Sequence, residues 1–300
     1  MQTNKGILLE SGTNELEIVE FTIANSRFGI NVIKVREIIP FFPATKIPFS
    51  HPNIEGVVSL RGEVVPVVHL ANVLRLPVSA GKPSEKLIIT EFNQLKVAFH
   101  VENVARIDRF SWEAIEQPND LAKDLEGLIT GIIHFDEDMI LLPDFEKIIF
   151  DINPHTGITK DRIKTVGKRE RSAKKILIAE DSALLRELLR ETLEEVGYAN
   201  LEFCVDGSEA YEKLEAYAKK GDIQNEIQLV ITDIEMPKMD GHHLTKRIKE
   251  DERFNVLPVI IFSSLITNDL KHKGERVGAD AQVSKPEVFS LVKQIDQYIL

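Results

Sequence analysis

Acidic, hydroxyl and amino side chains follow four short apolar runs in the second half of this 300-residue sequence. Glu180 and Asp181 end the first run, and Asp233 ends a second. Ser263 and Lys285 come at the ends of two later runs. In a doubly wound α/β fold the carboxyl ends of the strands line the ligand crevice, so these side chains are expected to meet there. Such a set predicts a phosphorylation site.

Asp233 is the predicted phosphoacceptor. We expect its carboxylate to be an exposed nucleophile that takes a phosphoryl group as an acyl phosphate. Lys285 is suited to pair with the phosphoryl charge, because its ammonium is compact. The Ser263 hydroxyl is able to donate a hydrogen bond to a phosphoryl oxygen. These three residues are the predicted catalytic set.

The same cluster predicts a magnesium site. Acyl phosphate formation needs a hard cation on the phosphoryl oxygens, and oxygen ligands suit Mg²⁺. Glu180, Asp181 and Asp233 are the expected ligands, with Glu235 as a further candidate. Each residue taken alone has a simpler explanation, such as a helix cap or a solvated loop. Their joint occurrence at strand ends favours the functional interpretation.

Strand and helix patterns alternate five times around these residues, which predicts a parallel sheet with helices on both faces. The expected strands are 175–180, 201–205, 228–232, 257–262 and 281–284. The expected helices are 182–196, 208–220, 240–251, 266–277 and 287–300. The first helix is the clearest, since leucines at helical spacing form one apolar face.

The first half of the chain has short alternating apolar runs, which predict a mainly β domain. It also repeats itself: residues 27–38 match 96–107 in pattern, and 56–60 match 131–135. Two β subdomains of similar plan, packed against each other, would explain this repeat.

Residues 56–70 predict a hairpin with Arg61 and Gly62 at its tip, where glycine permits positive φ. An arginine held out on a rigid hairpin suits a protein contact. An ordinary solvent-facing arginine in a turn is an equal alternative.

The histidines of this half show no spacing typical of a metal site, and none adjoins a nucleophile. They are His51, His69, His100 and His134. No metal or catalytic site is expected among them.

The expected domains are 14–157 and 175–300, joined by a basic linker at 158–174. Between positions 159 and 175 the chain has eight Lys or Arg against two acidic residues, and no apolar period. A solvated tether is favoured over a docking segment for an acidic surface.

Composition excludes several classes of protein. A net charge of −11 argues against a nucleic-acid-binding surface. No apolar run approaches the ~20 residues that span a bilayer, so no membrane insertion is expected. The single cysteine, Cys204, is expected to be a small buried thiol in a reducing compartment. With no signal peptide evident, we expect a cytoplasmic protein.

Residues 175–300 resemble a two-component receiver domain, a doubly wound, flavodoxin-like (βα)5 fold. The acidic pair, acceptor aspartate, hydroxyl residue and Lys285-Pro286 pair match in order. The resemblance implies phosphorylation at Asp233 with Mg²⁺ as cofactor. The acidic pair is Glu-Asp here, where many relatives have two aspartates. Gln282 stands where receivers often have an aromatic residue, so the family's coupling through that ring does not carry over.

Residues 14–150 resemble the CheW-like coupling domain, an all-β pair of SH3-like barrels. The resemblance depends most on residues 60–67, which read Leu-Arg-Gly-x-Val-x-Pro-Val. It implies that Arg61 and Gly62 lie on a partner-binding surface. His69 stands where relatives often have aspartate, so a role that depends on that acid does not carry over.

A CheW-like domain followed by a receiver is the arrangement of CheV-type chemotaxis coupling proteins. The resemblance implies a non-enzymatic adaptor that links methyl-accepting chemoreceptors to the histidine kinase CheA. Phosphorylation of Asp233 would regulate it, and protein contacts alone would associate it with membrane receptor arrays. A phosphate sink for the kinase and a phosphatase with an aspartate nucleophile are the alternatives.

Overall fold

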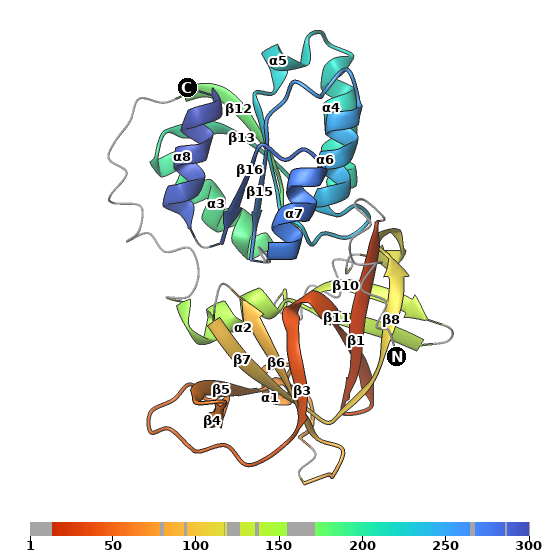
Figure 1. The fold of residues 1–300 in the computed structure, drawn as a ribbon, viewed down its shortest axis with the longest axis vertical. Coiled ribbons are helices and arrows are strands. Elements are labelled where there is room, and N and C mark those ends of the chain that lie inside the picture. The colour runs from red at the N-terminus through yellow and green to blue at the C-terminus, as the bar shows by residue number, and fades with distance from the viewer. Residues whose placement is uncertain are drawn as a thin grey trace. The chain divides into compact units, whose positions relative to one another are not determined.

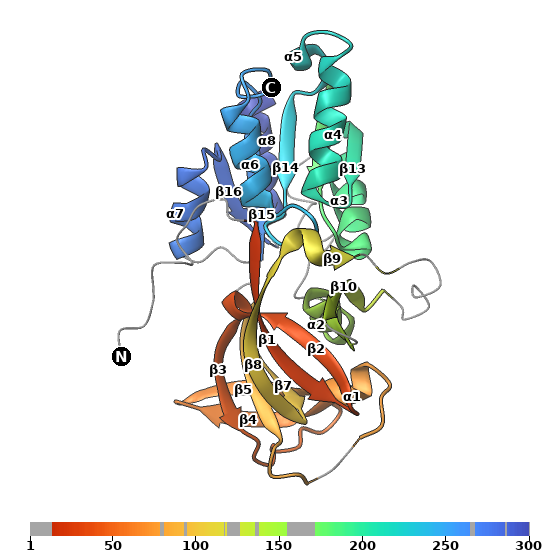
Figure 2. The ribbon, with the colours of Figure 1, turned by 90° about the vertical axis from the view of Figure 1, so that its right-hand side faces the viewer.

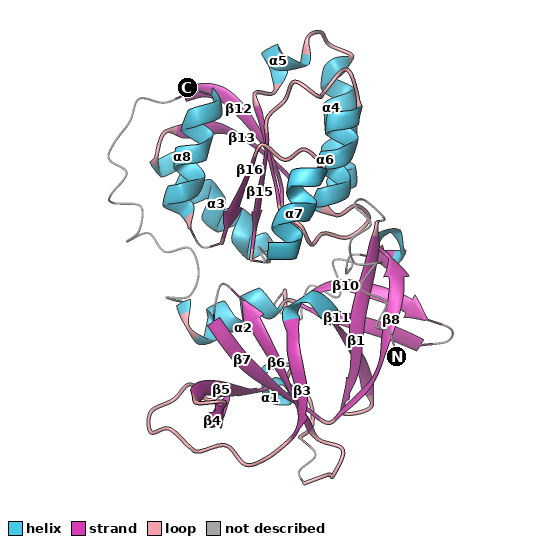
Figure 3. Cartoon of the chain, in the orientation of Figure 1, coloured by secondary structure: helices cyan, strands magenta, loops and turns pink. Residues whose placement is uncertain are grey.

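The structure is a computed structural model that describes residues 14–78, 81–92, 95–116, 118, 127–135, 138–154, 172–264, 268–285 and 287–299. Residues 15–154 form one compact unit, and the described residues from 172 onward make up nearly all of the other. Figure 1 labels the elements of both units, and Figure 3 separates helix from strand by colour. Most of the predicted linker, 158–171, lies outside the described residues.

The first unit is mainly β, as predicted, and its elements fall into two similar series. The first series is β1 (Glu15–Ile23), β2 (Ser26–Asn31), η1 (Val32–Lys34), β3 (Val35–Pro40), β4 (Ile54–Leu60), β5 (Glu63–His69) and α1 (Leu70–Val73). The second is β6 (Lys86–Phe92), β7 (Leu95–Val101), β8 (Asn103–Ser111), η2 (Trp112–Ala114), β9 (Ile115–Glu116), β10 (Ile129–Phe135), β11 (Asp138–Pro143) and α2 (Phe145–Ile152).

The two series exchange strands. One sheet has the order β8-β1-β2-β11-β10-β9, and the other has the order β3-β6-β7-β5-β4. The two orders correspond strand by strand. When β8, β1, β2, β11 and β10 are replaced by their counterparts in the other series, the order becomes β3-β6-β7-β5-β4. The only parallel pairs among the described strands of these sheets, β2 with β11 and β5 with β7, also correspond. The internal repeat is therefore confirmed, and each sheet needs both halves of the domain.

Strand exchange buries both faces of the central strands. On β1, Leu16 and Ile18 lie in the core of one barrel, whereas Val19, Phe21 and Ile23 face a core shared by the two barrels. On β6 and β7 the side chains divide between the second barrel and the same shared core. Strands buried on both faces lose clean alternation, which explains the approximate period in the sequence.

The second unit has the predicted alternation. Its elements are β12 (Ser172–Ala179), α3 (Ala183–Glu195), β13 (Tyr198–Cys204), α4 (Gly207–Ala218), α5 (Ile223–Glu226), β14 (Leu229–Thr232), α6 (Gly241–Glu250), β15 (Val259–Ser263), α7 (Asn268–Arg276), β16 (Ala281–Ser284) and α8 (Val288–Ile299). Strand β12 begins three residues earlier than predicted. The one-turn helix α5 was not predicted, because four residues are too few to show a helical period.

All five strands of this unit are parallel, in the order β13-β12-β14-β15-β16. Helices α3 and α8 cover one face and α4 and α6 cover the other, as Figures 1 and 2 show from two sides. Strands β14 and β15 are buried along their whole length. Among the described residues, no helix is both long and apolar enough to cross a membrane.

Candidate phosphoacceptor site

The strand order brings the predicted site residues to one edge of the sheet. Strands β12, β14, β15 and β16 are consecutive neighbours. Glu180, Asp233 and Lys285 directly follow β12, β14 and β16, and Ser263 is the last residue of β15. The backbone N–H of Asp233 donates to the Ala179 carbonyl at 2.9 Å, which continues the β12–β14 ladder into the site.

Lys285 joins the two acidic positions. Its Nζ lies 2.8 Å from Glu180 Oε2 and 3.1 Å from Asp233 Oδ2. The three side chains are only 2–4% exposed. Buried charges are tolerated when they are paired and hydrogen-bonded. The lysine therefore offsets part of the repulsion that two neighbouring carboxylates would otherwise suffer.

The expectation that Asp233 is exposed was wrong. Its side chain is nearly buried, because Lys285 covers Oδ2 and the backbone N–H of Ile234 donates to Oδ1 at 2.6 Å. The sequence pattern predicts where a strand ends, but not how closely its neighbours cover the next residue.

Three carboxylates are close enough to share a cation. Glu180, Asp181 and Asp233 each offer an oxygen, and these oxygens lie within 4.8 Å of one another. An all-oxygen carboxylate set fits a hard divalent cation such as Mg²⁺. Glu235 is half-buried and does not belong to this group.

Arg186 supports the acidic pair and was missed in the sequence. Its Nη1 donates to the carbonyl oxygens of Glu180 and Asp181, each at 2.7 Å. Ser182 is the N-cap of helix α3, so Arg186 lies in the first turn of this helix. A cation is disfavoured by the helix dipole in a first turn, so an arginine there was the available signal of a specific contact.

Gly241 lets helix α6 approach Asp233 closely. A Cβ at this position would overlap the carbonyl of Asp233 and lie 3.0 Å from Thr232 Oγ1. The Gly241 N–H donates to the Ile234 carbonyl at 2.9 Å, and Thr232 Oγ1 donates to the Asp233 carbonyl at 2.8 Å. The loop after Asp233 is thus folded tightly against the strand end, and a larger residue at position 241 would displace it.

Ser263 and Gln282 lie beside the site on the last two strands. Ser263 is buried, and its carbonyl accepts from the backbone N–H of Lys285 at 3.1 Å. Gln282 Nε2 donates to the Lys271 carbonyl of helix α7 at 2.8 Å, and its amide occupies the space where Gly274 lacks a Cβ. Gln282, at the position that is often aromatic in receivers, is therefore hydrogen-bonded to helix α7.

The hairpin predicted in the first unit is formed by β4 and β5. Arg61 has φ of 51° and Gly62 has φ of 87°. Positive φ at both central residues is the signature of a type I′ turn. The Arg61 side chain is 84% exposed, and its Nη2 lies 2.9 Å from Glu37 Oε2.

Two histidines that looked scattered in the sequence meet in the structure. His69 and His100 are paired across the parallel strands β5 and β7, with ring centroids 5.0 Å apart. A ring nitrogen of each lies within 4.8 Å of the other and of a Glu55 oxygen. The spacing of the histidines along the chain gave no sign of this proximity, because strand pairing joins residues that are distant in sequence.

Comparison with known proteins gives the same two domains. The protein-family model of the CheW-like domain matches residues 17–152. The family model of the response regulator receiver domain matches residues 176–296. Receiver domains generally bind Mg²⁺, which agrees with the acidic cluster described above.

Two curated relatives match over most of their length. Chemotaxis protein CheV3 of Helicobacter pylori is 33% identical over 302 residues, covering 95% of this chain and 95% of the relative. Chemotaxis protein CheV2 of the same organism is 30% identical, covering 88% of this chain and 87% of the relative. The chain therefore belongs to the CheV family of chemotaxis proteins, and it combines a CheW-like coupling domain with a receiver domain.

Proposed function

We propose that this protein links chemoreceptors to the histidine kinase CheA, and that phosphorylation of Asp233 regulates the link. The observation that carries the proposal is the contact of Lys285 Nζ with both Glu180 and Asp233 in a buried site. An ammonium in this position remains beside the phosphoryl group after transfer and pairs with its charge. The two domain matches and the relatives support the chemotaxis setting.

In the proposed transfer, an oxygen of Asp233 attacks the phosphorus of a phosphohistidine on the kinase. The new O–P bond forms as the P–N bond breaks, and the electron pair of that bond returns to the imidazole. Glu180, Asp181 and Asp233 would hold Mg²⁺, which when bound neutralises charge on the phosphoryl oxygens. Glu235 stays a further candidate, although its carboxylate lies outside the group of three. The Ser263 hydroxyl would donate to a phosphoryl oxygen.

The acceptor is tested with a small phosphodonor and Mg²⁺, followed by mass spectrometry of the modified peptide. We expect one modified residue, Asp233, and loss of labelling in Asp233→Asn. The matched control is Asp240→Asn, a change at another buried aspartate near the site. Asp240 caps helix α6 through the His243 N–H at 2.7 Å, and asparagine caps equally well. Modification that persists in Asp233→Asn would refute the assignment.

The CheW-like domain is proposed to contact its partners through the Arg61–Gly62 turn. The arginine is held out on a tight turn, and Val64, two residues after Gly62, is 71% exposed. Arg61→Asn should weaken receptor or kinase binding, because it removes the guanidinium while tolerating positive φ. Arg36→Asn is the control, since Arg36 is another exposed arginine of the same sheet and pairs with Glu91 at 2.9 Å. Equal binding by wild type and Arg61→Asn would exclude the turn as a contact.

Regulation is tested with reconstituted receptor and kinase. If phosphorylation regulates coupling, phosphodonor should change receptor or kinase binding in the wild type and leave Asp233→Asn unchanged. A phosphate sink would instead lower the amount of phosphorylated kinase with no change in binding. Sustained turnover of small phosphate esters would favour the phosphatase alternative.

A further inference from the structure

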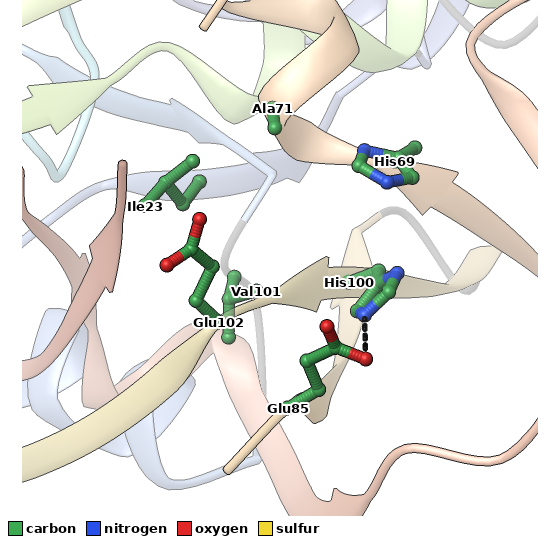
Figure 4. A pocket seen from close by; sticks show the side chains of 7 residues that line it. All are labelled: Ile23, His69, Ala71, Glu85, His100, Val101 and Glu102. Carbon is green, nitrogen blue, oxygen red and sulfur yellow. Dashed lines mark ion pairs between the residues drawn. The ribbon is translucent and has the colours of Figure 1, made fainter. Parts of the chain in front are cut away.

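Four ionisable side chains from separate segments converge in the second sheet of the CheW-like domain. Glu55 lies on β4, His69 ends β5, His100 lies on β7, and Glu85 directly precedes β6. Glu55, His69 and His100 each offer one ligand atom, and these three atoms lie within 4.8 Å of one another. Figure 4 shows both imidazoles and Glu85 from close by, around a small pocket.

His100 stands between two carboxylates. Its Nδ1 lies 2.9 Å from Glu55 Oε2, and its Nε2 lies 3.6 Å from Glu85 Oε2. Each ring nitrogen of His100 therefore faces a carboxylate oxygen. His69 Nδ1 is buried and has no hydrogen-bond partner among the described residues. A buried polar atom of this kind calls for a ligand, an ion or a water.

We propose that Glu55, His69 and His100 form a binding site for a divalent transition metal, with Zn²⁺ as the best match. Two imidazoles and one carboxylate are a set that zinc accepts while keeping a fourth position open. His100 would bind through Nδ1, which faces Glu55, and would donate its Nε2–H to Glu85. A carboxylate behind a metal-bound histidine fixes the tautomer and the orientation of the ring.

The surroundings hold these groups close to the required geometry. Tetrahedral ligands about 2.1 Å from zinc lie about 3.4 Å apart, so side-chain shifts on the order of 1 Å complete the site. Phe41 stacks on His100 with ring centroids 4.0 Å apart. Glu85 is buried, and its Oε1 accepts from the Lys82 N–H at 3.1 Å. The Glu55 side chain is 27% exposed and gives a metal ion access from solvent.

The proposal is tested on the full-length protein in excess Mg²⁺, which occupies oxygen-only sites but competes poorly for imidazole nitrogen. Equilibrium dialysis against Zn²⁺ should leave one ion per chain, and Co²⁺ should give the visible absorption of a tetrahedral nitrogen–oxygen site. Glu55→Gln and His69→Asn should each weaken Zn²⁺ binding by more than about tenfold. Glu85→Gln should weaken it by about 10- to 100-fold, the usual effect of losing a carboxylate behind a ligand.

A matched control is available in the same domain. His134 and Glu116 form an exposed histidine–carboxylate pair at 3.3 Å that belongs to no group of three possible ligands among the described residues. His134→Gln should bind Zn²⁺ as the wild type does. Glu55→Gln keeps a hydrogen-bonding partner for His100, so the variant should fold, and its melting temperature without metal reports whether it does. Zn²⁺ should raise the melting temperature of the wild type but not that of Glu55→Gln. Absence of Zn²⁺ binding, or equal binding by wild type and Glu55→Gln, would overturn the proposal.

Discussion

Cys204, the single cysteine of the chain, ends β13 in the core of the receiver and is 1% exposed. Burial raises the pKa of its thiol to about 12. Because the thiolate is the reactive form, we expect no reaction with a thiol reagent in the native protein at pH 8 and full reaction in denaturant. The control is a cysteine at the exposed position 219 (Lys219→Cys) in a protein that also carries Cys204→Ala. This cysteine should react at once in the native protein. Rapid native labelling of Cys204 would show that the core around it opens readily.

Lys285 should also be important for stability. Replacing it by methionine leaves neighbouring buried carboxylates without their cation, a defect that typically costs about 3–5 kcal/mol. Lys213→Met is the control, since Lys213 bridges Glu202 and Glu209 at 3.3 Å each but is 29% exposed. Lys213→Met should lower the free energy of unfolding by less than about 1 kcal/mol. Denaturant unfolding of both variants measures the difference, and equal losses would contradict the argument.

At the scale of elements, the fit between β16 and α7 depends on one glycine. Gly274→Ala should stabilise helix α7 by up to about 1 kcal/mol, because alanine has a higher helix propensity than glycine. In the wild type, however, the new methyl group displaces the Gln282 amide and costs its hydrogen bond to Lys271, about 1 kcal/mol. The substitution should therefore stabilise the Gln282→Ala protein but leave the wild type nearly unchanged. A double-mutant cycle by thermal or denaturant unfolding measures this coupling, which would be zero if the two side chains did not compete.

Helix α6 should make the receiver sensitive to acid. His242 near its start is buried, and burial lowers the pKa of this histidine from 6.5 to about 4. The folded state therefore favours the neutral ring, and the unfolded chain binds the proton more tightly. The contribution of His242 to stability should be fully present above pH 6.5 and should fall by up to about 3 kcal/mol as pH drops toward 4.

His242→Leu should flatten this pH dependence, because the titrating ring is gone. His243→Gln, at the next position of the same helix, should retain it. Urea unfolding at several pH values between 4 and 7 gives the slopes, and the same slope in wild type and His242→Leu would assign the pH effect to other groups.

At the scale of the whole molecule, the domains should be separable. The described residues form two compact units, and each has its own apolar cores. We expect limited proteolysis between 160 and 174 to release two fragments that each unfold cooperatively. Loss of cooperative unfolding in either fragment would place the boundary elsewhere.

Sequence patterns identified most of the receiver because its determinants are local. A strand ends where an apolar run ends, and in a parallel sheet those ends share one edge, so Glu180, Asp233 and Lys285 could be grouped without coordinates. The alternation of short runs and the repeat of 27–38 at 96–107 were likewise visible along the chain. Helix α5 was missed because a single turn is too short to show a period.

By itself, the sequence determined the two domain types, the grouping of Glu180, Asp233 and Lys285, and the internal repeat, because each depends on neighbouring residues or on the order of segments. Only the tertiary structure decided which strands pair across the repeat, how deeply Asp233 is buried, and that Glu55, His69 and His100 meet. These features depend on the register between distant strands and on side-chain packing. Neither leaves a periodic signal in the sequence, because contacts between distant strands are set by the folded chain as a whole.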